Sequence, residues 1–324
     1  MPICTHCTHK ISYLYTVYES ATNLRLDQCP NCLKFADPYV EHDVLTLLLD
    51  LILLKRDVFR HLLFNRGYEP RRASEASKWE NDKDKPFQKN LTLSKQEMDR
   101  RILTLRLGII LVFLDAFIRW SHLGPANAMF GDASAFWRRD RLEPLLRIFA
   151  GCIIETVAFH CGITLVSASF LKLEDILHRH KSEPTHKKSN VREELRLSHI
   201  PLTLIYSSLT KLFLLLLLAL WKPSSMSSNR PRTFSQPSTG TGFFRSALEI
   251  LDDDTLDREW VVRNVLGGMA AGFGLRVVLD LRPVLTTIII LVGWMVKTFV
   301  ANLLSPWVTK GDTFGNVFLA YSIP

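Results

Sequence analysis

The sequence predicts a mainly α-helical, multi-pass membrane protein that begins with a small cysteine-rich domain. Two Cys-x-x-Cys pairs lie within the first 32 residues, and long apolar blocks alternate with strongly charged segments further along the chain. Hydrophobic residues make up 47% of the chain although 22% are charged, and the mean hydropathy is +0.09. Because this hydropathy is high for a chain with so much charge, the apolar residues must be concentrated in blocks, as membrane helices require.

The charge balance and the cysteine count indicate a membrane surface and a reducing compartment. Lysine and arginine (40) exceed aspartate and glutamate (32), an excess of 8 that suits anionic lipids better than nucleic acid. The chain has six cysteines, and four of them form the two pairs, which favours a metal site in the cytosol over a disulfide framework. No signal-peptide pattern precedes Cys4, so we expect insertion through internal helices.

The spacing of Cys4, Cys7, Cys29 and Cys32 predicts a zinc ribbon over residues 1–38. Each Cys-x-x-Cys pair can form a tight turn that directs two thiolates at one ion, and two such turns complete the tetrahedral coordination of Zn²⁺. Between the pairs, residues 11–18 alternate as in a strand, residues 20–23 have turn composition, and LRLDQ leads back to the second pair. We therefore expect a β-hairpin between two cysteine knuckles.

Alternatives remain open for this segment. The cysteines could form disulfides or be unrelated buried thiols, and His6 or His9 could replace one of them as a ligand. Four thiolates saturate the ion and leave no position for water, which argues for a structural rather than a catalytic metal. Because so small a domain buries little apolar surface, we expect zinc binding to supply most of its folding free energy.

Residues 39–66 are expected to form an amphipathic, membrane-associated helix. The uninterrupted apolar stretch Val44–Leu54 has 11 residues and reaches about 16 Å, too short for a hydrocarbon slab of roughly 30 Å. Aspartates recur every seven residues near one helical face, and basic residues cluster where lipid phosphates would lie. The alternative to lodging in the membrane interface is packing against the later helices. The residues of this candidate interface are Asp43, Asp50, Asp57, Lys55, Arg56, Arg60 and His61.

The remainder divides into a polar linker over residues 67–99 and a transmembrane helical region over residues 100–324. About five spans are expected, at residues 102–123, 145–171, 200–221, 261–281 and 284–305, with a charged loop at 172–199 and a low-complexity loop at 222–246. In the fourth span, Gly268 and Gly272 have the spacing that allows close helix approach. Basic residues before the first span and in the charged loop predict a cytosolic ribbon, although those in the low-complexity loop argue against this orientation.

Several ionisable residues interrupt the apolar blocks, and charges inside a membrane usually face the bundle interior or a water-lined path. Asp115 from the first span, with Glu155 and His160 from the second, forms a candidate intramembrane polar path that could bind a lipid headgroup. The alternative is that residues near helix ends reach the surface while the others pair internally. The full set comprises Asp115, Glu155, His160, Lys211, Arg276, Asp280 and Lys297.

The N-terminal motifs resemble a known family. The SYLYTVYES strand, the CPNC knuckle and the LLLDLILLK and FRHLLFN segments are similar, over residues 3–66, to the homology domain of the Arv family of eukaryotic endoplasmic-reticulum membrane proteins. The resemblance implies a location in the endoplasmic-reticulum membrane, or in the Golgi membrane. It also implies a role in sterol transport, sphingolipid metabolism and glycosylphosphatidylinositol (GPI) anchor assembly. Beyond residue 66, only the general layout of linker and spans matches.

The sequence contains no recognisable nucleophile elbow, Gly-rich phosphate loop or HExxH helix. We therefore expect a non-enzymatic protein, and the apolar segment that follows the ribbon argues against nucleic acid as a partner. The family resemblance implies that its partners are membrane lipids, namely sterols, sphingolipids or GPI precursors. The main alternative is a scaffold subunit that binds the enzymes of GPI-anchor assembly. A membrane glycosyltransferase or acyltransferase with an unrecognised site is a third interpretation.

Overall fold

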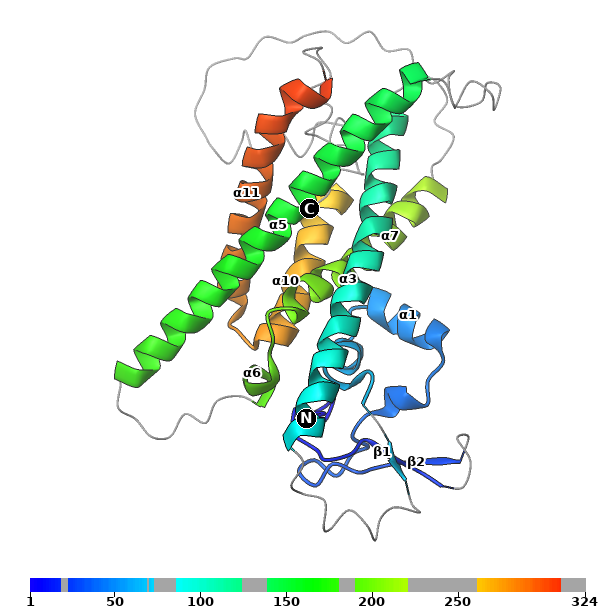
Figure 1. Cartoon of the computed structure of the whole chain (residues 1–324), viewed down its shortest axis with the longest axis vertical. Coiled ribbons are helices and arrows are strands. Elements are labelled where there is room, and N and C mark those ends of the chain that lie inside the picture. The colour runs from blue at the N-terminus through cyan, green and yellow to red at the C-terminus, as the bar shows by residue number, and fades with distance from the viewer. Residues whose placement is uncertain are drawn as a thin grey trace, which may run out of the picture.

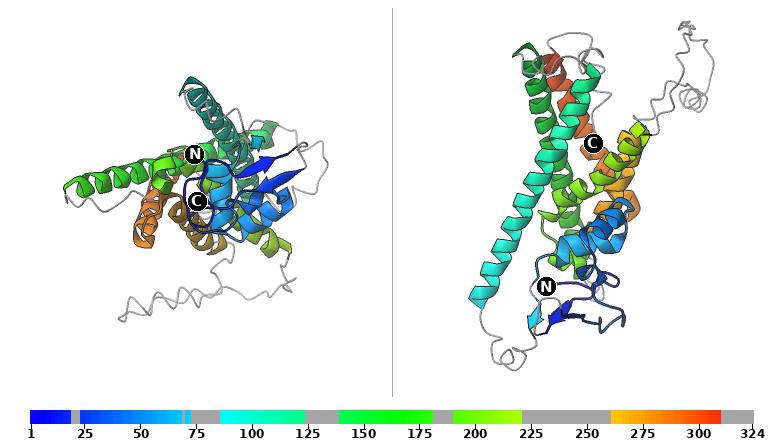
Figure 2. Two further views of the ribbon diagram at one scale, coloured as in Figure 1. Left: turned by 90° about the horizontal axis from the view of Figure 1, so that it is seen from below. Right: turned by 90° about the vertical axis from the view of Figure 1, so that its right-hand side faces the viewer.

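The protein is a bundle of helices with the cysteine-rich ribbon packed at one end (Figure 1). This computed structural model describes residues 1–18, 23–68, 70–72, 86–123, 139–180, 190–220 and 261–309. The low-complexity loop 222–246 lies outside the described residues, as do most of the expected hairpin turn and parts of the linker and of the charged loop. Figure 2 shows from two further directions that the long helices extend away from the ribbon.

The ribbon contains the expected antiparallel hairpin and an additional short strand. Strand β1 (Tyr15–Val17) pairs antiparallel with β2 (Leu24–Leu26), and Tyr15 lies opposite Leu26. A two-residue strand, β3 (Arg71–Arg72), pairs parallel with β1, so the chain returns to the ribbon after the helices of residues 39–66. The sequence does not predict β3, because its surroundings are polar and lack strand periodicity.

Residues 39–66 form two short helices and not the single helix expected. Helix α1 (Val44–Ile52) ends at a turn in which Leu54 has a left-handed φ of 56°, and α2 (Arg56–Arg60) continues into the π-helical turn η2 (His61–Asn65). A 3-10 turn, η1 (Pro38–Val40), precedes them. Because the helix is interrupted at Leu54, the heptad spacing no longer places the three aspartates on one helical face. The break could not be predicted from the hydrophobic periodicity, because Leu54 adopts a left-handed conformation that usually favours glycine.

The break allows α2 to pack into the bundle. Val58, Phe59 and Leu63 are buried, and the rings of Phe59 and Phe273 meet edge-on with centroids 6.1 Å apart. This core includes residues of α7 (His199–Leu220) and α10 (Gly267–Leu279). Of the two alternatives for residues 39–66, packing against the later helices therefore holds for α2. Helix α1 also contacts α7 and buries Leu51 in the same core, but its other side exposes an apolar surface formed by Val44, Leu45, Leu48 and Leu49, with Leu53 after its end.

Long helices build the bundle. They are α3 (Pro86–Leu123), α5 (Arg139–His180), α7 and α11 (Pro283–Thr309). Helix α5 packs along α11 and α3, while α10 packs against α7 (Figure 1). The short helix α6 (Asn190–Glu194) precedes α7, and the π-helical turn η6 (Val262–Leu266) leads into α10.

Two loops that the sequence predicts are shorter in the structure. The expected linker is already helical from Pro86, because proline fits the first turn of a helix, where its missing N–H has no partner to lose. Helix α5 continues to His180, through the first part of the expected charged loop. Both loop predictions were based on polar composition, which also describes the exposed end of a helix that extends beyond a membrane.

Three of the described helices are long and apolar enough to cross a membrane, at Leu145–Ile176, His199–Leu218 and Pro283–Val308. The expected five spans are therefore not confirmed. The first expected span lies in α3, where Arg106, Asp115 and Arg119 add charge to the apolar stretch. The fourth corresponds to Asn264–Leu279, whose 16 residues reach only about 24 Å.

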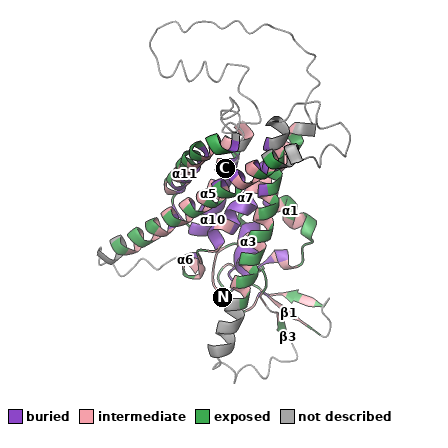
Figure 3. Ribbon diagram, turned by 45° about the horizontal axis from the view of Figure 1, so that its top comes forward, coloured by how far each residue is buried: buried purple, intermediate pink, exposed green. Residues whose placement is uncertain are grey.

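The outward surfaces of the long helices are apolar, as contact with lipid requires. Exposed residues follow the outer sides of α3, α5 and α11 (Figure 3). On α3 they include Leu105, Ile109 and Phe113, and on α11 they include Phe299 and Leu303. Soluble proteins rarely expose continuous apolar surfaces of this kind. This part of the chain therefore has the surface of a membrane protein.

Close helix approach occurs at glycines other than the pair predicted from spacing. A Cβ on Gly293 would lie 2.5 Å from Ile163 Cγ1, so α5 and α11 can pack this closely only with glycine there. A Cβ on Gly274 would lie 2.8 Å from Thr203 Cγ2, at the contact between α10 and α7. Of the predicted pair, a Cβ on Gly272 would lie 3.4 Å from Ile290 Cδ1 of α11, an ordinary contact, and a Cβ on Gly268 would meet nothing within 4 Å. Spacing alone does not tell which glycines face a neighbouring helix.

A buried polar network attaches the ribbon to the helices. The carboxylate of Asp37 is fully buried and accepts hydrogen bonds from the backbone N–H of Tyr39 (3.1 Å) and the side-chain amide of Asn65 (2.7 Å). His61 Nδ1 lies 2.7 Å from the same carboxylate. The Asn65 amide also bonds to the backbone N–H and C=O of Ile3, at 2.9 and 2.8 Å. The ribbon is therefore fixed to η2 and cannot move as an independent domain.

We expect the substitution Asp37→Asn to loosen the ribbon. The asparagine amide would present either an N–H donor or a weaker acceptor to the Asn65 amide N–H and to His61. A buried polar group left without a partner costs about 1–3 kcal/mol. Hydrogen exchange of the zinc-loaded full chain should show lost protection in the ribbon. Glu41→Gln, at an exposed neighbouring position, should leave exchange unchanged. Equal protection in Asp37→Asn and the wild type would contradict this role of the network.

Candidate functional site

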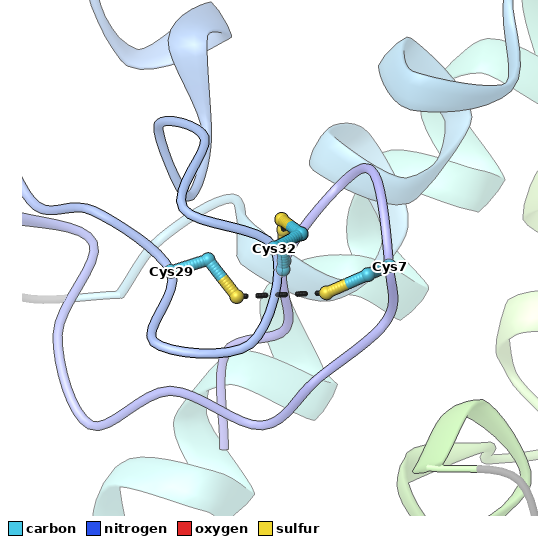
Figure 4. Close-up of side chains that lie close together, drawn as sticks. Cys7, Cys29 and Cys32 are labelled. Carbon is cyan, nitrogen blue, oxygen red and sulfur yellow. Dashed lines mark hydrogen bonds between the residues drawn. The ribbon is translucent and has the colours of Figure 1, made fainter.

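Four cysteine sulfurs meet between two loops of the ribbon. The Sγ atoms of Cys4, Cys7, Cys29 and Cys32 all lie within 4.8 Å of one another. The two Cys-x-x-Cys pairs face each other, with 3.7 Å between the Sγ atoms of Cys4 and Cys32 and 3.5 Å between those of Cys7 and Cys29. Figure 4 marks the contact between Cys7 and Cys29. Because disulfide sulfurs lie about 2.05 Å apart, all four are free thiols here.

The two knuckles that carry these cysteines have the same backbone geometry. In each, the N–H of the first cysteine, Cys4 or Cys29, donates a 2.8 Å hydrogen bond to the carbonyl five residues later. The residue four positions after that cysteine, Thr8 or Leu33, has a left-handed φ of 62° or 57°. This repeated turn directs both thiols of a pair to one side, which is the physical reason for the Cys-x-x-Cys spacing.

The four cysteines could hold one metal ion, and their distances fit zinc. With Zn–S bonds of about 2.3 Å, sulfurs at the corners of a tetrahedron lie about 3.8 Å apart, close to the separations found here. Burial raises the pKa of Cys4 to about 12 and also raises that of Cys29. For Cys7 the effect of burial is outweighed by hydrogen bonds, beginning with that from the His9 backbone, and its pKa falls to about 7. A cation would favour the thiolate form of all four.

The histidines considered as alternative ligands lie outside this cluster. Within the described residues, the metal-binding cluster consists of the cysteines alone. His6 Nδ1 lies 3.4 Å from Asp57 Oδ2, a residue of α2. His6 therefore faces α2 rather than the sulfur atoms.

Two of the basic residues expected at a lipid interface face the protein instead. Arg60 donates hydrogen bonds to the backbone carbonyls of Thr5 (2.7 Å) and His6 (2.9 Å), and His61 is buried beside Asp37. Both side chains attach the ribbon to the helices. The sequence pattern could not show this, because the partners are backbone atoms and a buried acid more than 20 positions away.

The acidic and remaining basic residues of this segment have separate positions. Asp43 caps α1, and its hydrogen bonds from the Thr46 hydroxyl and N–H lower its pKa. Asp50 accepts a 2.9 Å hydrogen bond from the Tyr39 hydroxyl and lies 2.7 Å from Lys55 Nζ. Asp50 is thus turned toward the protein. Of the basic residues predicted here, Lys55 and Arg56 stay exposed and could meet a lipid surface.

In the helical region, a buried arginine joins the two acids of the expected polar path. Arg119 donates to Asp115 Oδ2 and Glu155 Oε2, both at 2.9 Å, with a second contact of 3.3 Å to each carboxylate. Arg119 and Glu155 are 1% and 0% exposed. We name Asp115, Arg119 and Glu155 the triad. Sequence reasoning missed Arg119, although its position four residues after Asp115 is a spacing at which helical side chains pair.

His160 lies beside a neighbouring pocket, which we name the cationic pocket. Its polar lining consists of His160 and Thr156 from α5, Lys211, Ser207 and Ser208 from α7, Lys297 from α11 and Asp115 from α3. Both lysines are buried. The pocket has a volume of about 60 Å³. The sequence shows both lysines within apolar blocks but gives no sign that three helices bring them and His160 together.

An apolar groove of about 840 Å³ adjoins the cationic pocket. Its walls include Leu54 from the turn after α1, Leu214 from α7, Gly268 from α10, and Ile290 and Trp294 from α11. Residues Phe159, Gly267 and Ala271 line both the groove and the cationic pocket. The volume lies within the range of roughly 300–1,000 Å³ that is common for ligand sites. A small charged pocket beside a large apolar groove suits an amphiphilic molecule.

Comparison with known proteins places these features in a family context. The Arv1-like family model matches residues 3–232. "Protein arv1" of Schizosaccharomyces pombe is 29% identical over 167 residues, which cover 50% of this chain and 52% of that relative. "Protein ARV 2" of Arabidopsis thaliana is 47% identical over 62 residues, or 19% of this chain and 27% of the relative. "Protein ARV1" of Saccharomyces cerevisiae is 46% identical over 63 residues, or 19% of each chain.

The matched regions span about half the length of these relatives or less. The two short matches, at 46% and 47% identity, cover about as many residues as the ribbon and the two helices that follow it. No solved structure matches the chain.

We expect Cys29→Ser to abolish metal binding and unfold the ribbon while the membrane helices stay inserted. Loss of one thiolate would open the coordination shell, and we expect the ribbon to take most of its folding free energy from metal binding. Zinc content by atomic absorption and hydrogen exchange in residues 1–35 should both report the loss. Cys161→Ser, an exposed cysteine of α5, should retain the zinc of the wild type. Wild-type zinc content in Cys29→Ser would refute the ligand assignment.

Arg119→Leu should strongly destabilise the bundle. It leaves two buried carboxylates without the guanidinium that joins them, which typically costs about 3–5 kcal/mol, whereas leucine at all three triad positions should recover most of the loss. Thermal unfolding in detergent, followed by tryptophan fluorescence, measures this.

Arg147→Leu is the matched control for this experiment. Arg147 also pairs with an acid four residues earlier, Glu143 at 2.6 Å, but at a more exposed position. Such a pair contributes less than about 1 kcal/mol. Equal melting temperatures for Arg119→Leu and Arg147→Leu would contradict a structural role for the triad.

Proposed function

The chain belongs to the Arv1-like family, and from this premise we propose that it is a non-enzymatic protein of lipid homeostasis in the endoplasmic-reticulum membrane. In this proposal it mediates or regulates the intracellular transport and distribution of sterols, with effects on sphingolipid metabolism and on the presentation of GPI precursors. Its ligands are membrane lipids. The four cysteines hold a structural Zn²⁺ that keeps the ribbon folded.

The apolar groove is the observation that carries this proposal. It lies between α7, α10 and α11, two of which are among the helices able to cross a membrane. Its volume of about 840 Å³ and its apolar walls suit the body of a lipid, which would enter from the bilayer without passing through water.

Helix α1 supports the proposal because it connects the membrane surface with the groove. Its N-terminal end is polar, with Glu41, His42 and Asp43 exposed, whereas its helical surface is apolar. At its other end, the Ile52 carbonyl accepts a 3.1 Å hydrogen bond from Thr210 of α7, and Leu54 lines the groove. A short apolar helix in this position would dip partly into the bilayer.

The proposed orientation places the ribbon in the cytosol. Four free thiols arranged for a metal are typical of a reducing compartment. Arg196 follows α6, whose Glu193 and Glu194 pair with Lys10 and the N-terminus of the ribbon, so this basic residue lies on the ribbon's side of the bundle, where the positive-inside rule favours it. The proposed location in the endoplasmic-reticulum membrane is based on the family resemblance, which is also compatible with the Golgi membrane.

The second candidate is a scaffold subunit of a membrane-bound complex for GPI-anchor assembly. The observation that favours it is the exposed apolar surface of the ribbon, where Tyr18, Leu33 and Phe35 are 40%, 76% and 53% exposed. A partner protein on the cytosolic side could bind there. Stable copurification of such an enzyme, together with absence of lipid transfer, would favour this alternative.

Filling the groove should block lipid handling. Gly268→Phe places a ring in open space, since a Cβ there meets nothing within 4 Å, so the fold should be preserved while the groove is occupied. The purified chain in liposomes should transfer a fluorescent sterol to acceptor liposomes, and Gly268→Phe should reduce the rate about tenfold.

Leu303→Phe provides the control, because Leu303 is 64% exposed on α11 and does not line the groove. It should transfer sterol at the wild-type rate. Unchanged transfer by Gly268→Phe would exclude the groove as the route, and no transfer by the wild type would count against direct sterol transport.

A further inference from the structure

Two serine hydroxyls of the cationic pocket are limited in what they can bind. Ser207 donates its hydroxyl proton to the carbonyl of Leu204 at 2.8 Å, and Ser208 donates its proton to that of Ile205 at 2.7 Å. A hydroxyl has one proton and two lone pairs, so each serine Oγ can still accept a hydrogen bond but has no second proton to donate. Both serines line the pocket. A ligand that bonds to them must therefore carry a donor.

The charges around the pocket do not call for a charged ligand. The lining includes the carboxylate of Asp115 as well as Lys211 and Lys297. Asp115 belongs to the triad, and both lysines take part in interactions of their own. Buried charges of both signs that interact within a protein stabilise one another. The serines, which accept hydrogen bonds whatever the charge of the donor, are therefore the groups that define the ligand.

The size of the pocket restricts the polar group that can enter it. A volume of about 60 Å³ would hold one hydroxyl group together with a few water molecules at about 10–15 Å³ each. A sugar or phosphate headgroup is much larger than a hydroxyl. Thr156 and His160 of α5 line the same pocket and can donate hydrogen bonds to the oxygen of a ligand. The pocket thus offers both acceptors and donors to a single hydroxyl.

The depth of the serines explains why such a site would matter to a lipid. Ser207 lies eight residues after His199, the first residue of α7, and so about 12 Å along a helix that is able to cross a membrane. Ser207 is buried, with 2% of its surface exposed. A hydroxyl that leaves the water at the membrane surface for this depth loses hydrogen bonds, which is costly unless new partners replace them. The serines can supply the replacement.

The cationic pocket opens into the apolar groove. Phe159, Gly267 and Ala271 line both cavities. At this boundary, a Cβ on Gly267 would lie 3.2 Å from Lys211 Cδ, so the glycine leaves room beside the lysine stem. A molecule with its hydroxyl in the pocket could therefore extend its apolar body directly into the groove.

We propose that the cationic pocket binds the hydroxyl of a lipid that has no other polar group, while the apolar groove holds its hydrocarbon body. The ligand hydroxyl donates to Ser207 or Ser208 and accepts from the donors of α5. Sterols and long-chain alcohols share this chemistry. A sterol that is esterified, or oxidised to a ketone, lacks the donor, so the site selects the unmodified sterol. This inference deepens the proposed function, on which it rests, by assigning the group that is recognised.

The test is equilibrium binding of tritiated cholesterol to the purified full-length chain in detergent, with unlabelled competitors. Cholestenone has the same ring system, but its ketone oxygen can accept and not donate. In the wild type, cholesterol should displace the label at about tenfold lower concentration than cholestenone, because only cholesterol gives the serines a donor. This comparison needs no variant and so does not depend on a substituted protein folding. Oleyl alcohol, a flexible chain with the same terminal hydroxyl, distinguishes a sterol site from a site for any alcohol.

Variants then test the residues. The double substitution Ser207→Ala with Ser208→Ala should weaken cholesterol binding about tenfold and leave the binding of tritiated cholestenone unchanged. A general defect of the fold would weaken both ligands. Ser169→Ala is the matched control, because the Ser169 hydroxyl also donates to a helix carbonyl, that of Leu165 at 2.9 Å, but is exposed on α5 outside both cavities. It should bind both ligands as the wild type does.

The outcomes separate the two proposals. Equal displacement by cholesterol and cholestenone in the wild type would overturn the hydroxyl site and leave sterol handling intact. The same holds if the double variant still prefers cholesterol as strongly as the wild type. Displacement by oleyl alcohol at lower concentration than by cholesterol would support the hydroxyl site and count against sterols as its ligand. Absence of saturable cholesterol binding by the wild type would count against both the site and the proposed function.

Discussion

The rest of the structure depends on one buried carboxylate, that of Asp37. It lies at the end of the ribbon, where it caps η1, and it also faces two side chains of the turn that ends the α1–α2 segment. A buried charge is tolerated only when it is surrounded by donors, so the ribbon and the helices must meet in one arrangement. The same segment packs Phe59 against α10. The cysteine-rich ribbon is therefore joined to the membrane helices through buried contacts.

The membrane part of the protein is organised by a second buried arrangement of charge. A charged group inside hydrocarbon is costly, and here Arg119 contacts an acid on its own helix and another on α5. This contact specifies how α3 packs on α5. Lys297 of α11 and Lys211 of α7 line the pocket beside this contact. The contacts of Arg119 thus add a charge-specific constraint between α3 and α5, whereas glycines set the close approach of α5 to α11 and of α10 to α7.

The sequence predicts the parts of this structure that depend on local spacing. The cysteine pairs, the hairpin between them and the long apolar helices all follow from patterns within a few residues or turns. The number of spans does not, because hydropathy does not distinguish a helix that crosses the bilayer from one shielded by its neighbours. The roles of Arg60 and His61 depend on partners distant in the sequence, and the left-handed break at Leu54 leaves no trace in the periodicity, so a single chain carries no signal for them. For Arg119, the spacing of four residues from Asp115 is an available signal, whereas its second partner, Glu155, is 36 positions away. Asp115 and Glu155 are recognisable as unusual residues, but only the structure shows that an arginine joins them.

The two left-handed residues of the knuckles have a consequence for how strongly the four cysteines would hold a metal ion. Thr8 and Leu33 occupy positions at which glycine would carry no penalty, and each costs about 1–2 kcal/mol relative to glycine. Under the proposal that the ribbon folds only when it holds a metal ion, this cost is subtracted from the free energy of metal binding and raises the dissociation constant roughly tenfold for each knuckle. Occupancy of the four-sulfur centre should therefore respond to the supply of free zinc at higher concentrations than in a ribbon with glycine at both turns.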